Sequence, residues 1–150
     1  MQNTIVQAVQ IQLLNASATA LTTATGKSLP LPQGVQAGGG LWPQPVTNAL
    51  YLNPGWWILE WNLNFNLTAS TTTVVSGGPS TTTNVAPSID NGLVQQSVIL
   101  TTNTGVYNIN DELLVNVPAQ GLNYFLVALN TFSAGSQTAS GYINAYQLAP

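Results

Sequence analysis

The sequence predicts an all-β protein, an antiparallel β-sandwich or jelly roll of about eight strands, and three observations support this. In residues 56–67 every odd position is large and apolar, and from position 60 every even position is polar. Such alternation is typical of a β-strand with one buried face, because successive side chains point to opposite sides. Short apolar runs separated by Gly, Pro, Asn and Thr turns recur along the chain. Helix is disfavoured in the first third by four prolines, Pro30, Pro32, Pro43 and Pro45.

Residues 1–14 are predicted as an N-terminal arm or first strand, and residues 15–150 as a single β-sandwich domain. Val9, Ile11 and Leu13 alternate with glutamines, which indicates a strand. The stretch has neither the positive n-region nor the unbroken apolar core of a secretory signal. No run approaches the ~18 apolar residues of a membrane span. Two interpretations stay open: a strand of the chain's own core, or an arm that pairs with a neighbouring subunit, because edge strands readily accept such pairing.

Residues 15–49 are rich in Ala, Thr, Gly, Pro and Ser and are predicted as loop. The glycine triplet at 38–40 is not a phosphate cradle, because no Lys-Ser/Thr follows it. Residues 49–52 form a short predicted strand. The turn at Asn53-Pro54-Gly55 then leads into the central strand at 56–67.

The second half of the chain continues this strand-and-turn pattern. The Thr-rich stretch 68–92 predicts at most a hairpin with few core residues, closed by an Asp-Asn-Gly turn. Residues 122–132 are apolar on both faces, as expected of a strand packed on two sides. Residues 133–141 are predicted as a polar loop. The other predicted strands are 93–101, 106–109, 113–117 and 142–148.

The large apolar side chains of the two most regular strands are expected to pack in the core or in a trimer interface. Aromatic and aliphatic side chains dominate both kinds of packing, because they bury the largest area. These residues are Trp57, Leu59, Trp61, Leu63, Phe65, Phe125, Val127 and Leu129.

Charged residues make up 3% of the chain, against about 25% in an ordinary domain. Lys27 is the only cation, and Glu60, Asp90, Asp111 and Glu112 are the only acids. One lysine is too few to neutralise phosphates or hold an anionic membrane, so we expect neither nucleic acid nor membrane as a partner. The absence of His and Cys excludes imidazole bases, thiol nucleophiles and Cys/His zinc sites.

The few acids predict no enzyme, no cofactor and no metal. Asp111 and Glu112 are adjacent, and neighbours on a strand face opposite ways, which does not suit a glycosidase dyad. Oxygen ligands for calcium exist at Asp90 with Asn91, and at Asp111 with nearby asparagines. Two carboxylates are few for such a site, and Asx turn chemistry accounts for these residues.

The aromatic residues outside the main alternation allow two interpretations. Aromatic rings with polar neighbours suit stacking on sugars. Trp and Tyr are also enriched in cores and subunit interfaces, because each combines a large apolar area with a polar group, and we favour this second interpretation. The residues concerned are Trp42, Tyr51, Trp56, Tyr107, Tyr142 and Tyr146.

Two stretches resemble known virion and jelly-roll proteins. Residues 122–128, the Thr-Phe-Ser-Ala-Gly segment at 131–135 and the Gly-Tyr-Ile-Asn-Ala-Tyr-Gln-Leu segment at 141–148 resemble the closing hairpin of small tailed-phage virion proteins. Residues 52–57, leading into 61–65, resemble the Pro-Gly-Trp/Tyr strand of TNF/C1q-like jelly rolls. The phage proteins usually carry an Arg in the last strand, where this chain has Tyr146 or Gln147.

The resemblance implies a homotrimeric jelly roll that decorates a phage capsid as a cement protein. Its partners would be copies of itself and the major capsid protein, its location the capsid surface of the virion, and it brings no catalytic residues. The low charge agrees with a subunit of an assembly, because a free soluble protein normally needs net charge to avoid association. The residues expected to contact the capsid or another partner are Ile5, Val9, Ile11, Leu13 and Trp42.

Two other functions stay open from the sequence. One is a glycan- or receptor-binding module of a phage fibre, which the exposed aromatics would serve. The other is a subunit of an extracellular filament in which residues 1–14 are donated as a strand to the next copy.

Overall fold

The computed structural model describes residues 9–23, 25–31, 48–68, 72, 74–85, 87, 96–99 and 104–148, with backbone alone for 9–15, 17 and 96–99. These residues form β-strands and no helix, which confirms the all-β prediction. The strands are β1 (Val9–Ala20), β2 (Lys27–Ser28), β3 (Leu50–Leu52), β4 (Gly55–Thr68), β5 (Val74–Ser80), β6 (Gln96–Ile99), β7 (Gly105–Val117), β8 (Leu122–Thr131) and β9 (Ser136–Gln147).

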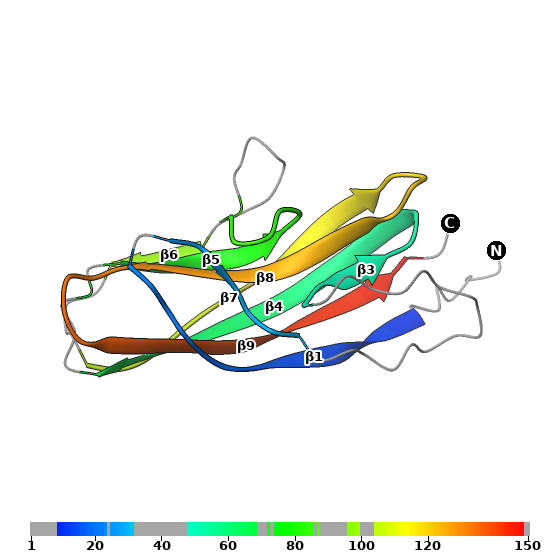
Figure 1. The fold of residues 1–150 in the computed structure, drawn as a ribbon. Helices are drawn as coiled ribbons and strands as arrows, with labels where there is room; N and C mark the ends of the chain where they lie inside the picture. The colour runs from blue at the N-terminus through cyan, green and yellow to red at the C-terminus, as the bar shows by residue number, and fades with distance from the viewer. Residues whose placement is uncertain are drawn as a thin grey trace.

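The strands form two sheets that lie as two layers (Figure 1). Sheet A has the order β1-β9-β4-β7, and sheet B has the order β2-β8-β5-β6, with β3 also paired to β8. Every pairing is antiparallel. The predicted antiparallel sandwich is therefore confirmed.

The order of the strands is that of a jelly roll. β2 and β3 follow one another along β8, at Ser28↔Val127 and Leu50↔Tyr124, so we count them as two pieces of one strand. The eight resulting strands are then distributed over the two sheets in the orders 1-8-3-6 and 2-7-4-5. Two Greek keys wound into two four-stranded sheets give this arrangement.

The inner face of sheet A supplies most of the core. The apolar row of β4 predicted for core or trimer packing lies in the protomer's own interior, with exposed fractions of at most 1%. The buried indole N–H of Trp57 donates to the Asn53 carbonyl oxygen at 2.8 Å, so this polar group is satisfied. Tyr124, Leu126 and Ala128 of β8 pack against the same cluster from sheet B.

Sheet B is also buried on its outer side along β8. Val127 is fully buried and Phe125 nearly so, and both belong to a second cluster with Ala49. Leu129, from the same predicted set, is half-buried. The two-sided apolar pattern of residues 122–132 therefore corresponds to a strand with two buried faces.

Four stretches differ from the sequence-based prediction. The predicted loop 15–49 contains the end of β1, which continues to Ala20, and the short strand β2. The predicted loop 133–141 is wrong from Ser136 onward, because β9 begins there and Gln137 pairs with Leu67. Residues 106–109 and 113–117 belong to one strand, β7, which runs straight through Asn110-Asp111-Glu112. The polar stretch 68–92 contains β5, which pairs with both β6 and β8. In each case backbone pairing with long neighbouring strands overrides a polar local sequence.

Two glycines permit close contact inside the fold. A Cβ on Gly141 of β9 would lie 2.1 Å from the Asn62 carbonyl oxygen of β4. A Cβ on Gly77 of β5 would lie 2.3 Å from the Val127 carbonyl oxygen and 2.5 Å from Leu63 Cδ1. Only glycine fits where another backbone approaches this closely.

Candidate functional site

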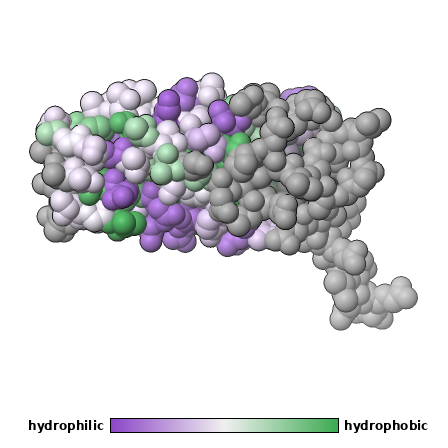
Figure 2. Space-filling view, turned by 60° about the horizontal axis from the view of Figure 1, so that its bottom comes forward, coloured by the Kyte–Doolittle hydropathy of each residue, from purple (hydrophilic) through white to green (hydrophobic). Residues whose placement is uncertain are grey.

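The outer face of sheet A gathers the side chains that chemistry could use. Strand residues alternate between faces, and the inner row of β4 is odd-numbered, so even-numbered residues of β4, β7 and β9 share the outer face. In Figure 2, where the lower layer of Figure 1 is turned forward, hydrophilic residues gather in the middle of the visible face. The candidate site lies on this side of the molecule.

The registers place three rows of side chains across the face. The first row is Leu114, Ile58 and Tyr146, the second is Glu112, Glu60 and Asn144, and the third is Asn110, Asn62 and Tyr142. An apolar row therefore lies beside an acidic row and an amide row.

Glu60 is held by its neighbours on β9. The Tyr146 hydroxyl donates to Glu60 Oε2 at 3.0 Å, and Asn144 Nδ2 donates to the same oxygen at 3.5 Å. Desolvation, followed by the hydrogen bond and the charge of Glu60, raises the pKa of Tyr146 above its usual range. The phenol therefore stays protonated and keeps donating at neutral pH.

Glu60 also lies directly opposite Glu112 of β7. Like charges in directly opposed strand positions repel each other. The only cation of the chain, Lys27, is on β2 in sheet B. Within the described residues the acidic row is therefore uncompensated.

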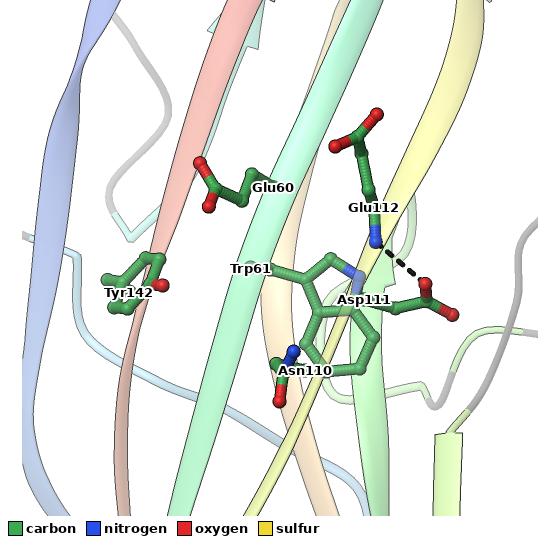
Figure 3. A pocket seen from close by; sticks show the side chains of 6 residues that line it. All are labelled: Glu60, Trp61, Asn110, Asp111, Glu112 and Tyr142. Atoms are coloured by element: carbon green, nitrogen blue, oxygen red, sulfur yellow. Dashed lines mark hydrogen bonds between the residues drawn. The ribbon is translucent and has the colours of Figure 1, made fainter.

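A shallow pocket of about 270 Å³ opens beside this acidic row (Figure 3). We call it the acidic pocket. Its volume lies just below the ~300–1,000 Å³ of sites for drug-sized ligands, so it suits one side chain or one sugar ring better than a large cofactor. Its lining residues are Glu60, Trp61, Asn110, Asp111, Glu112 and Tyr142.

Asp111 and Glu112 differ in their surroundings. The Glu112 side chain is exposed, whereas Asp111 is half-buried and its Oδ1 accepts from the Glu112 backbone N–H at 2.8 Å (Figure 3). Among the described residues, no three His, Cys, Asp or Glu side chains are grouped to hold a metal ion. The groups that the pocket offers are carboxylates, amides and a phenol, which bind hydroxyls or a cationic side chain by hydrogen bonds.

Large exposed side chains lie in the apolar row and in the row next to it. Leu114 is 57% exposed, and Trp56, two residues before Ile58 on the same face of β4, is 50% exposed. Trp56, Tyr142 and Tyr146, three of the candidate sugar-stacking aromatics, thus share this face. Exposed aromatic and aliphatic side chains next to polar groups are typical of interaction surfaces.

The remaining candidate aromatics are placed elsewhere. Tyr107 packs against the core cluster, and the Tyr51 hydroxyl donates to the Gln120 carbonyl oxygen at 3.2 Å, near the β7–β8 turn. Trp42 lies outside the described residues, as does Asp90. Neither Tyr51 nor Tyr107 therefore joins the acidic pocket.

The predicted partner-contact residues of the N-terminus fall at the edge of sheet A. Val9 and Ile11 belong to β1 and pair with Gln147 and Ala145 of β9, and Leu13 lies further along the same strand. Ile5 lies outside the described residues. Pairing of residues 1–14 with a neighbouring subunit concerns an assembly and stays a prediction.

The pairing of Glu60 with Glu112 is the feature that the sequence did not reveal. The two residues are far apart in the chain, and only the register between β4 and β7 brings them together. A partial signal was available for Glu60 alone, which occurs at a polar position of the alternating stretch 56–67.

Comparison with known proteins identifies no relative. No protein-family model matches the chain, and no curated protein matches its sequence. Over the described ranges, no helix has the length and apolar character that crossing a bilayer requires. The function is therefore argued from the fold and the site alone.

Proposed function

We propose that this chain is a non-enzymatic virion structural protein, a capsid decoration or cement protein that binds the outer capsid surface as a homotrimer. The observation that carries the proposal is the jelly-roll strand order combined with a nearly uncharged surface. Jelly rolls recur in viral capsid proteins, and also in lectins and cupins. A surface with 3% charged residues suits a protein held among copies and neighbours.

Binding would stabilise the shell by mass action. A ligand that binds only the intact state stabilises it by about 2.7 kcal/mol per site at a hundredfold excess over its Kd. Many symmetric copies multiply this effect over the shell. Because exposed charges are screened by salt, contacts made chiefly by apolar and amide groups depend little on ionic strength.

The test compares virus particles assembled with and without this chain. We expect electron microscopy to show it on the outer surface, and we expect particles without it to release their genome at a lower temperature. A particle variant carrying Leu114→Asp should lose bound protein, whereas Ala119→Asp, at an exposed site in the turn between β7 and β8, serves as the control. Absence of the chain from purified particles would contradict the proposal.

A second candidate, a glycan-binding module, is favoured by one observation. Trp56, Tyr142 and Tyr146 lie on the same face as Glu60 and Asn110, which combines aromatic surfaces with hydrogen-bonding groups for sugar hydroxyls. Titration with cell-surface glycans should then quench Trp fluorescence in the unmodified protein and not in Trp56→Ala. Unchanged fluorescence across the glycan panel would leave the decoration role as the function to test.

A further inference from the structure

The single cation of the chain, Lys27, lies apart from the acidic row of sheet A. Lys27 is exposed on β2, which pairs with β8 in sheet B. No ion pair joins it to any residue in the described part of the chain. The uncompensated acids Glu60 and Glu112 lie on the outer face of sheet A, which points away from sheet B.

The backbone around Lys27 is firmly held. The Ser28 N–H donates to Asn84 Oδ1 at 2.8 Å, and the Asn84 N–H donates back to Ser28 Oγ at 2.7 Å. Asn84 has a φ of 57°, a left-handed conformation that Asn tolerates well. These bonds join β2 to the loop after β5, where Val85 is 50% exposed. The exposed side chains of Lys27 and Val85 are therefore held on one edge of sheet B by these hydrogen bonds.

The outer face of sheet A carries acidic and apolar groups that complement Lys27 and Val85. Glu60 and Glu112 provide negative charge at a pocket sized for one side chain, and Leu114 beside them provides apolar surface. Glu60 is already oriented by Tyr146, so little ordering is needed when a cation arrives. The match between a fixed cationic edge and a fixed acidic pocket points to a contact between two copies.

We propose that the acidic pocket of one copy receives Lys27 of a second copy, so that edge and face meet head-to-tail. The inference rests on the proposed self-association and names its contact. Face-to-face docking of two identical acidic rows would oppose like charges, which disfavours that arrangement. A head-to-tail contact instead repeats from copy to copy and closes into a ring when the rotation allows it, as in a trimer.

The experiment reverses the charges one at a time and then together. Sedimentation velocity of the full chain over a range of concentrations measures the oligomer and its dissociation constant. We expect Lys27→Glu and Glu112→Lys each to raise that constant at least about tenfold, because each creates a like-charge contact. The double variant restores a Lys–Glu pair in reversed orientation and should return towards the unmodified value.

Controls separate this contact from general damage. Both positions are exposed, and circular dichroism checks that each variant keeps its β-structure. Asn66→Lys places a lysine on the same face, four rows from the apolar row, and should leave association unchanged.

Three outcomes would overturn the inference in distinguishable ways. A strictly monomeric unmodified protein removes the proposed homotrimer together with this contact. An oligomer that tolerates both single reversals removes this contact and leaves the homotrimer standing. Single variants that dissociate, without recovery in the double variant, assign the two residues to separate contacts within the oligomer and not to each other.

Discussion

Sheet A and sheet B differ in the length of their strands and in how many faces of the central strand are buried. In sheet A the strands are 12 to 14 residues long, and β4 has one buried and one partly exposed face. In sheet B no strand exceeds 10 residues, and β8 is buried on both faces. Both faces of β8 are therefore buried within the chain's own fold. Of the faces of β4 and β8, only the outer face of β4 stays partly exposed.

The largest expected change in the free energy of unfolding comes from a substitution on the buried face of sheet A. Trp61→Ala should lower the free energy of unfolding by about 3–5 kcal/mol, because it leaves a large cavity in the core. Asn64→Ala, on the opposite face of the same strand, should change it by less than about 0.5 kcal/mol. Urea denaturation followed by Trp fluorescence and circular dichroism measures both. Similar losses in the two variants would show that both faces of β4 are packed.

The next effect tests the second buried face of sheet B. Val127→Ala should cost about 2 kcal/mol, because two methyl groups are removed from a closed site. Val106→Ala removes the same groups from a side chain that is 65% exposed and should be nearly neutral. Equal urea midpoints for the two variants would contradict the burial of the outer side of β8.

A smaller effect concerns pH and involves one tyrosine from each sheet. Burial raises the pKa of Tyr124, and desolvation with the Glu60 hydrogen bond raises the pKa of Tyr146. Both phenols thus hold their protons more tightly when folded than when unfolded, where the pKa is about 10. Their contribution is complete below about pH 10 and is lost as the pH rises through the folded values.

Urea midpoints measured from pH 8 upward check this behaviour. The midpoint should stay level to about pH 10 and fall above it. Tyr124→Phe removes one of the two titrations, so its fall should be shallower. An identical fall in the two proteins would exclude Tyr124 as a source of the pH dependence.

The smallest effect concerns buried amides at one end of the sandwich. Asn130 is 1% exposed, and neither its Oδ1 nor its Nδ2 has a hydrogen-bond partner among the described residues. Asn130→Leu should therefore be neutral or stabilising, because no bond is lost. Gln137 donates from Nε2 to Thr72 Oγ1, so Gln137→Leu should cost about 1 kcal/mol. A loss above about 1 kcal/mol in Asn130→Leu would show that a buried water pairs with this amide.

The two sheets also differ in how far the sequence predicts them. The alternation in β4 predicted a strand at 56–67, and the structure has Gly55–Thr68. This strand was predictable because a strand with one buried face has apolar residues at every second position. β5 is Val-Val-Ser-Gly-Gly-Pro-Ser, and its strand character comes from two neighbours that a local pattern does not contain. The site was partly predictable for the same reason: Glu60 was expected on the polar face of β4, but its pairing with Glu112 depends on register.

The position of β9 in sheet A determines the order in which the strands of this sheet can pair. β9 lies between β1 and β4, so β1 has as its partner a strand more than 100 residues later in the chain, with Val9 opposite Gln147. During synthesis β1 therefore stays unpaired along that side until β9 has emerged from the ribosome. Pairings between such distant segments form slowly. Sheet A is complete only when β9 inserts between β1 and β4.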